Sequence, residues 1–198
     1  MPHILNDAQH AAIGRVATQA ARLEAVLEGF LVDALTHDTE VALVAVAGAQ
    51  FERKTRMLEA ILNLRIPTSE DLPAVKELLE EARVVMQERN AFLHGMWQFD
   101  ADANLQVQNR ERRSRKIKVR TVSVGDLNET AKRMTFLADE IEGSWTDLLV
   151  DIGAYQALEP GLWQQISPHR PYATEEEKRR PGSFVIALSE ADDESPDT

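Results

Sequence analysis

The stretch that decides the fold runs from Leu72 to Trp97 and reads LPAVKELLEEARVVMQERNAFLHGMW. Its apolar residues recur at intervals of three and four, which is the period of an amphipathic helix with one face in a protein core. Arg89 interrupts this apolar face, and Asn90 and His94 follow at the far end of the helix. A guanidinium on a core-facing stripe needs a carboxylate partner, a neighbouring subunit or an anionic ligand, because burying an unpaired charge is costly.

Three further long helices are predicted around this stretch. The first spans about residues 7–35 and the second about residues 39–64, and both keep the same three-four apolar spacing. The last opens at the capping pattern Asp126-Leu127-Asn128-Glu129 and continues to about Ile152. The sequence therefore predicts a mainly α protein built as an up-and-down four-helix bundle.

A small β-ribbon is predicted between the third and fourth long helices, at about residues 96–124. Gly95 follows His94 where a helix commonly ends on a left-handed glycine. Residues 96–100 and 105–109 then alternate around Asp102-Ala103-Asn104, which predicts a hairpin, and residues 116–124 are typical of another strand. Residues 1–155 are thus expected to form one domain.

Residues 156–198 are predicted to be an irregular, partly disordered acidic tail. Prolines and mixed charge break any helical period there, and acids gather near the end of the chain. One apolar run in this tail, Ser183-Phe-Val-Ile-Ala-Leu188, is a candidate for docking as a strand or binding a partner.

Composition limits the class of protein. A chain of 198 residues with 43% apolar residues can bury one substantial core. No segment has the length and hydropathy of a membrane span, the start of the chain does not resemble a signal peptide, and there are no cysteines. We therefore expect a soluble cytoplasmic protein with no membrane association.

The charge distribution is uneven. A net charge of −11 argues against generic attraction to nucleic acid, because phosphates are attracted by positive potential. Between residues 110 and 120 of the predicted ribbon, however, seven basic residues accompany a single acid, Glu111. We interpret them as possible RNA contacts or, alternatively, as a solvated exposed hairpin: Arg110, Arg112, Arg113, Arg115, Lys116, Lys118 and Arg120.

The polar residues at the end of the third helix suit cleavage of a phosphodiester without a metal. A histidine can remove the proton from a ribose 2′-hydroxyl, and an arginine can stabilise the charged phosphorane. Asn90 and His94 share a helix face, so that Asn90 is expected to orient the imidazole. Arg89 and His94 differ by about 140° in azimuth, which indicates an incomplete site that a second subunit would complete.

The Arg-Asn-x-x-x-His motif at the end of a helix, within a predicted four-helix bundle, resembles the HEPN superfamily over about residues 7–152. That resemblance implies a homodimer and a metal-independent endoribonuclease of the toxin–antitoxin, antiviral or RNA-processing kind. It assigns catalytic roles to Arg89 and His94, with Asn90 as the polar residue after the arginine. The basic ribbon and the tail lie outside the minimal family pattern.

Other interpretations stay open. The alternative for Arg89 is a structural ion pair with an acid such as Glu59, Glu140 or Glu142. The alternative for His94 is an interaction with the helix dipole alone. Lys54 lies within the apolar face of the second predicted helix. It either reaches the RNA site or packs only its aliphatic stem against the core, with its ammonium in water. The alternative functions are a non-catalytic HEPN-like dimeric interaction module and a nucleotide-binding regulator, and an antitoxin or another protein is a possible partner.

No cofactor or metal site is predicted. The sequence has no Walker loop, no Gly-x-Ser-x-Gly elbow and no histidine preceded by glutamate at the spacing of a ferritin-like dimetal site.

Overall fold

The computed structural model describes residues 5–36, 39–110, 117–152, 155–159 and 162–165. The protein is mainly helical, with a small antiparallel sheet between its fourth and fifth helices, as the sequence predicts. The elements in chain order are α1 (Asp7–Leu35), α2 (Thr39–Val46), α3 (Phe51–Arg65), α4 (Leu72–His94), β1 (Met96–Phe99), β2 (Leu105–Arg110), β3 (Ile117–Thr121), α5 (Val124–Asp151), β4 (Tyr155–Glu159) and β5 (Leu162–Gln165).

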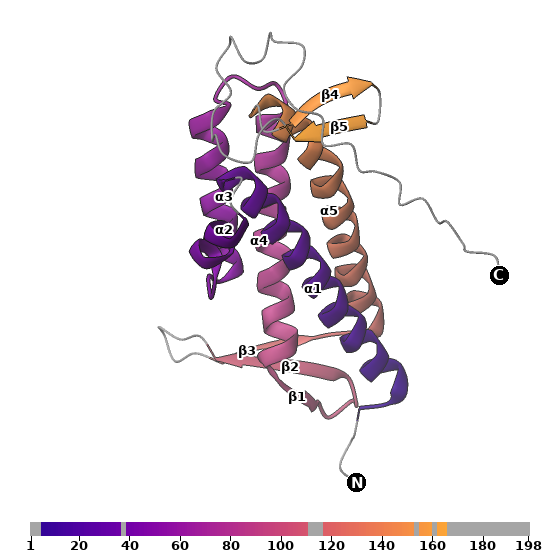
Figure 1. Cartoon of the computed structure of the whole chain (residues 1–198). Helices are drawn as coiled ribbons and strands as arrows, with labels where there is room; N and C mark the ends of the chain where they lie inside the picture. Colours follow the sequence, from indigo (N-terminus) through magenta and orange to yellow (C-terminus); the bar gives the residue numbers. More distant parts are fainter. Residues whose placement is uncertain (1–4, 37–38, 111–116, 153–154, 160–161, 166–198) are drawn as a thin grey trace, which may run out of the picture.

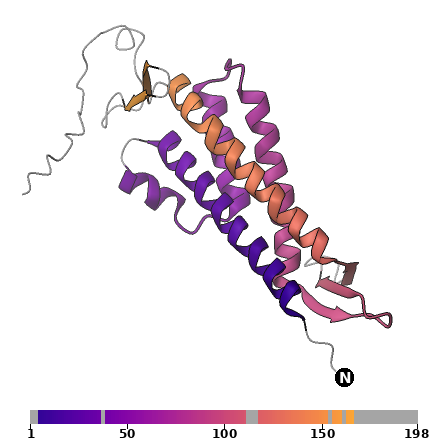
Figure 2. The same cartoon turned by 90° about the vertical axis from the view of Figure 1, so that its right-hand side faces the viewer.

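The long helices pack side by side around one apolar core. α1 lies along α5 for much of its length, α4 contacts α1, α3 and α5, and α3 also packs on α1 (Figures 1 and 2). The sheet β1–β2–β3 closes one end of this helical layer, and the β4–β5 pair lies at the other end. No helix in the described part of the chain combines the length and the apolar character needed to cross a bilayer.

α1 begins at a reciprocal cap. The Asn6 side chain accepts a hydrogen bond from the Gln9 backbone N–H at 2.9 Å, and the Gln9 side chain accepts one from the Asn6 backbone N–H at 2.8 Å. The apolar side chains that follow at helical spacing are fully buried and include Val16, Leu23, Leu27 and Phe30. This stripe is the part of α1 that packs in the core.

The single helix predicted over residues 39–64 is wrong, because the chain forms two helices there. α2 ends at Val46 and α3 begins at Phe51, and the turn between them places Gly48 at φ +68°. Only glycine adopts this left-handed conformation without steric cost, so the helical hydrogen-bond pattern stops here even though the apolar spacing continues through the break. The turn positions Gln50 and Phe51 at the start of α3.

The end of α4 lies against the sheet. Gly95 is the C-cap of α4, but its φ of −76° and ψ of 157° are extended, so the predicted left-handed conformation is wrong. The chain instead enters β1 directly, and the Trp97 indole N–H donates to the Phe92 carbonyl at 3.0 Å. A Cβ at position 95 would lie 2.2 Å from Val107 Cγ2, which shows that glycine is needed for close approach of helix and sheet.

The ribbon has the predicted hairpin and third strand. β1 pairs with β2 from Met96↔Gln108 to Phe99↔Leu105, and β2 pairs with β3 from Gln106↔Thr121 to Arg110↔Ile117. Both pairs are antiparallel, with β2 in the centre. Val107 on β2 is buried, so one face of the sheet packs on the helices while the other faces outward.

α5 begins two residues earlier than the predicted capping pattern. Ser123 Oγ accepts from the Asp126 backbone N–H at 3.1 Å, while Asp126 Oδ2 accepts from the Ser123 backbone N–H at 2.7 Å. The reciprocal cap therefore joins Ser123 to Asp126 rather than Asp126 to Glu129. The Ser123 backbone leaves the sheet at this point, and that geometry decides which side chain can cap.

The start of the predicted irregular tail is regular. β4 and β5 form an antiparallel pair from Tyr155↔Gln165 to Glu159↔Leu162, with an irregularity between Ala157 and Glu159. The rest of that tail, including the apolar run at residues 183–188, lies outside the described residues.

Candidate functional site

Residues from four elements line a surface pocket beside the last turns of α4. The pocket has a volume of about 690 Å³. Its α4 wall contains Gln87, Asn90, Ala91 and His94, which recur at helical spacing on one stripe. α4 also contributes Arg83, Met86 and Arg89 to the lining. The remaining lining comes from α1, from the start of α3 and from β2, and consists of Glu24, Gln50, Phe51, Glu52 and Asn109.

Arg89 and His94 line the same pocket although their azimuths on α4 differ. Arg89 Nη1 donates a hydrogen bond to Asn90 Oδ1 at 2.8 Å, and Asn90 lies on the stripe that carries His94. The long arginine side chain thereby reaches the pocket from a neighbouring face of the helix. Both groups therefore line one pocket of a single chain, and completion of the site by a second subunit stays a prediction.

Arg89 has hydrogen-bonding capacity that the described residues do not use. The residue is half-buried, and its Nε is buried without a hydrogen-bond partner. No carboxylate of the described chain forms an ion pair with it: the adjacent Glu88 pairs with Arg133 at 3.2 Å instead. The structural ion pair considered for Arg89 with Glu59, Glu140 or Glu142 is therefore not formed within the described chain.

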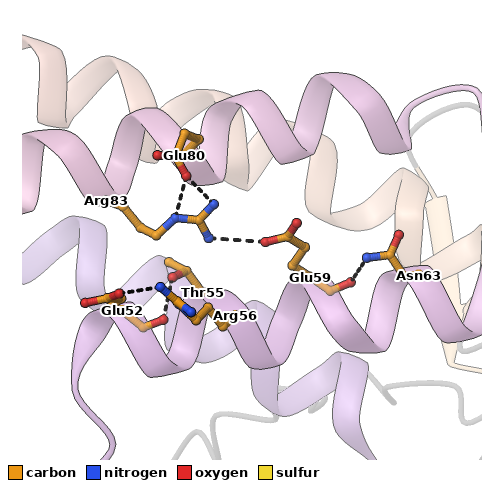
Figure 3. A network of polar contacts seen from close by, with 7 residues as sticks. All are labelled: Glu52, Thr55, Arg56, Glu59, Asn63, Glu80 and Arg83. Atoms are coloured by element: carbon orange, nitrogen blue, oxygen red, sulfur yellow. Dashed lines mark hydrogen bonds and ion pairs between the residues drawn. The ribbon is translucent and has the colours of Figure 1, made fainter.

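Arg83, between one and two turns earlier on α4, is paired with two carboxylates, unlike Arg89 in the described chain. Its guanidinium contacts Glu80 on the same helix and Glu59 on α3, the latter at 3.2 Å (Figure 3). Burial alone would lower the pKa of Arg83, but its hydrogen bonds to Glu80 and Glu59 outweigh that effect and raise the pKa. Arg83 is thus a fixed cation that ties α3 to α4 beside the pocket.

The other charges of the pocket are also paired. Glu52 accepts from Arg56 at 2.7 Å, and Glu24 accepts from Lys54 at 3.1 Å. Within the described lining, Arg89 is the arginine whose charge meets no carboxylate. A negatively charged partner for Arg89 would have to come from outside the described residues.

His94 occupies the last turn of α4, as predicted, and its side chain is exposed. No hydrogen bond joins Asn90 to the imidazole as predicted, and Asn90 Oδ1 accepts from Arg89. None of the described side chains hydrogen-bonds to His94, which lines the pocket.

Lys54, a predicted RNA contact, is not among the residues that line this pocket. Its side chain is 7% exposed, and its ammonium contacts Glu24 and Glu28 of α1. Burial would lower the pKa of Lys54, but hydrogen bonds to Glu28 and Glu24 outweigh that effect and raise it. Lys54 therefore joins α3 to α1, and a phosphate would have to displace two carboxylates to reach it.

The basic ribbon is only partly described. Arg112, Arg113, Arg115 and Lys116 lie outside the described residues.

Arg110, Lys118 and Arg120 are exposed on β2 and β3. Lys118 is the cross-strand neighbour of Asn109, so it lies on the sheet face that carries this pocket residue. Arg120 stacks over the Phe92 ring, with its Cζ 5.5 Å from the ring centroid. This cation–π contact holds the guanidinium against the end of α4.

The sequence alone did not identify several of the lining residues. Helical spacing could have predicted Gln87 as a neighbour of the motif, because it lies three residues before Asn90 and seven before His94 on the same helix face. Gln50, Glu24 and Asn109 come from segments distant in the chain, and only the tertiary packing brings them to α4.

The described residues contain no group of three or more histidine, aspartate or glutamate side chains placed to hold a metal ion. Comparison with protein-family models, with characterised proteins and with solved structures gives no significant match to this chain.

Proposed function

We propose that this protein is a metal-independent endoribonuclease of the HEPN type, with Arg89 and His94 as its catalytic residues. One observation carries the proposal: a half-buried guanidinium with no carboxylate partner among the described residues lines the same pocket as a histidine with no side-chain partner. The pocket thus combines a side chain suited to binding a phosphate with a side chain suited to proton transfer.

The reaction follows from these two groups. His94 removes the proton of a ribose 2′-hydroxyl, and the resulting oxygen attacks the adjacent phosphorus. Arg89 donates its free N–H groups to the phosphorane oxygens, where negative charge develops. The bond to the 5′-oxygen then breaks as that oxygen takes up a proton from water, and His94 returns its proton to the solvent. The products are a 2′,3′-cyclic phosphate and a 5′-hydroxyl end.

The proposal extends to architecture and assembly. α1, α3, α4 and α5 are assigned to the four helices of an up-and-down bundle, with α2 as a short addition before α3. A second copy of the chain would place another Arg89 and His94 near the first pair, and Arg110 and Lys118 would contact flanking phosphates. A cytoplasmic location and an antitoxin partner belong to the same proposal.

The test is cleavage of single-stranded and structured RNA in EDTA, with Arg89→Ala and His94→Ala purified beside the wild type. We expect each substitution to lower the rate by about 10²-fold or more, the usual contribution of a general base or of an oxyanion-stabilising donor. The matched controls are His10→Ala and Arg15→Ala, which change an exposed histidine and arginine of α1 outside the pocket lining.

The outcomes separate the functions considered. Cleavage lost in both pocket variants and kept in both controls, with cyclic phosphate ends, supports the ribonuclease. Nucleotide binding without cleavage by the folded wild type would favour the nucleotide-binding regulator. Neither binding nor cleavage would favour an interaction module in which the motif has no catalytic role.

A further inference from the structure

Four side-chain amides meet in the pocket beside Arg89. Gln50 comes from the N-cap of α3, Gln87 and Asn90 from α4, and Asn109 from β2. Each amide carries one carbonyl acceptor and two N–H donors. The pocket is therefore lined by donors and acceptors from three different elements, which is more than a bare phosphate needs.

Most of this hydrogen-bonding capacity is uncommitted. Asn90 Oδ1 accepts from Arg89, but the side chains of Gln50, Gln87 and Asn109 make no hydrogen bond with another described residue. Some amides elsewhere are paired: Gln98 donates to Gln106 at 3.1 Å, and Gln106 donates to Asp100 at 3.2 Å. Gln19 Oε1, outside the pocket, is buried without a hydrogen-bond partner among the described residues, so the pocket is distinguished by three unpaired amides on one lining.

The pocket also has an apolar wall. Phe51 is half-buried and packs against the core, and Met86 is 5% exposed. Ala91, between Asn90 and His94 in the α4 lining, adds little bulk. An aromatic and a thioether side chain suit the flat face of a heterocycle, while amides suit its polar edge.

A nucleobase matches this set of groups better than the other parts of an RNA chain do. Phosphate accepts hydrogen bonds but donates none at neutral pH, whereas base edges present donors and acceptors together. Unpaired RNA bases are read in proteins by aromatic stacking combined with hydrogen bonds to their edges. The volume of about 690 Å³ lies within the roughly 300–1,000 Å³ typical of small-molecule sites.

We infer that this pocket binds one unstacked nucleobase of the RNA substrate and selects its identity through Gln50, Gln87 and Asn109. This inference rests on the proposed function, because it takes the neighbouring Arg89 as the phosphate site. Gln50, Gln87 and Asn109 are then specificity residues, and cleavage occurs at a nucleotide whose base is unpaired and of one preferred type.

The test measures binding rather than cleavage. The affinities of the four nucleoside 5′-monophosphates are compared with that of ribose 5-phosphate, which has the sugar and phosphate without a base. We expect at least one nucleotide to bind about tenfold or more tightly than ribose 5-phosphate, the discrimination that a bidentate amide–base contact supplies. Gln87→Ala and Asn109→Ala should each reduce that ratio several-fold.

Two further variants serve as controls. Arg89→Ala should weaken the binding of ribose 5-phosphate and of the nucleotides by the same factor. The ratio of their affinities should therefore stay unchanged. Gln98→Ala removes an amide on β1 that is not part of the pocket lining, and it should change neither affinity. Gln87 is exposed on a helix, where alanine is well tolerated, so loss of selectivity in Gln87→Ala is not explained by unfolding.

The outcomes distinguish this inference from the proposed function. If none of the four nucleotides binds more tightly than ribose 5-phosphate, the pocket does not recognise a base, even if the protein cleaves RNA. Cleavage sites with no preferred base would do the same. Selective nucleotide binding that depends on Gln87 and Asn109, without cleavage of any RNA, supports the base pocket and contradicts the ribonuclease.

Discussion

Gly95 shows how a correct element boundary can have a different physical cause from the one its sequence suggests. A glycine after the last helical residue commonly adopts a left-handed conformation, yet Gly95 is extended. Its lack of a side chain matters because a Cβ would lie 2.2 Å from Val107 Cγ2 and 2.5 Å from the Ala91 carbonyl oxygen. The glycine permits the sheet to approach α4 beside His94.

Gly95→Ala is therefore expected to destabilise the fold. Forcing a methyl group into a packed contact typically costs about 1–3 kcal/mol, because the neighbouring strand has to shift. Urea denaturation followed by circular dichroism measures this loss. The substitution should also reduce RNA cleavage, since it displaces Asn109 and His94 from each other.

Gly143→Ala is the matched control for this substitution. Gly143 lies within α5, and a Cβ there meets no atom within 4 Å. Alanine in a helix interior is roughly 0.5–1 kcal/mol more favourable than glycine, so this variant should be slightly more stable than the wild type. Equal stability of Gly95→Ala and Gly143→Ala would contradict the close contact at Gly95.

At the scale of the element, the start of α5 is set by how the chain leaves the sheet. Val122 N–H donates to the Leu105 carbonyl at 2.9 Å, so the backbone stays attached to β2 until the residue before Ser123. Ser123 is then the first residue free to cap the helix, and Asp126 returns its hydrogen bond. The backbone N–H and hydroxyl of Ser123 hold the pKa of Asp126 below its usual value.

This cap has a predictable pH dependence. The folded state lowers the pKa of Asp126, so its stabilising contribution is present above the unfolded pKa of about 4 and is lost as the pH falls through the folded value. Asp126→Asn should be less stable than the wild type at pH 7, and this difference should shrink between pH 5 and pH 2. Denaturation midpoints over that pH range measure it.

Glu129→Gln is the control, because the alternative cap in the sequence pattern would have used Glu129. We expect it to leave stability at pH 7 unchanged, whereas Ser123→Ala should cost about 0.5–2 kcal/mol, the range for loss of an N-cap. A larger effect at Glu129 than at Ser123 would show that the helix begins where the sequence pattern suggested.

At the scale of the whole molecule, an apolar core rather than surface charge joins the first and last long helices. Phe30 of α1 is fully buried and stacks on Trp145 of α5 with ring centroids 5.8 Å apart. Gly29 lets this ring approach, since a Cβ there would lie 2.4 Å from the indole. The ion pairs of Arg22 with Asp139 and Glu142 join the same helices but are exposed to water.

Phe30→Ala should therefore cost far more stability than Arg22→Ala. Removing a buried phenylalanine typically costs about 3–5 kcal/mol, since apolar contacts are lost and a cavity remains. Exposed ion pairs are screened by water and salt, so Arg22→Ala should change the urea midpoint little. A loss of stability in Arg22→Ala similar to that in Phe30→Ala would contradict this account.

Local patterns in the sequence were sufficient for most of the elements. The apolar period of α1, α4 and α5 and the alternation of β1, β2 and β3 are properties of adjacent residues, and the structure has all of these elements. The break at Gly48 was missed because the apolar residues on both sides keep one helical period across it. β4 and β5 were missed because proline and charge suggested irregular chain.

Residue spacing along the chain was enough to predict the mainly helical class, the inserted sheet and the position of Arg89, Asn90 and His94 at the end of α4. Each of these depends on the spacing of residues along one segment. Only the tertiary structure decided that Lys54 is buried between Glu24 and Glu28, that Arg89 has no carboxylate within the described chain, and that Gln50 and Asn109 face α4. Such contacts join residues far apart in the chain, so they depend on how the helices and the sheet pack.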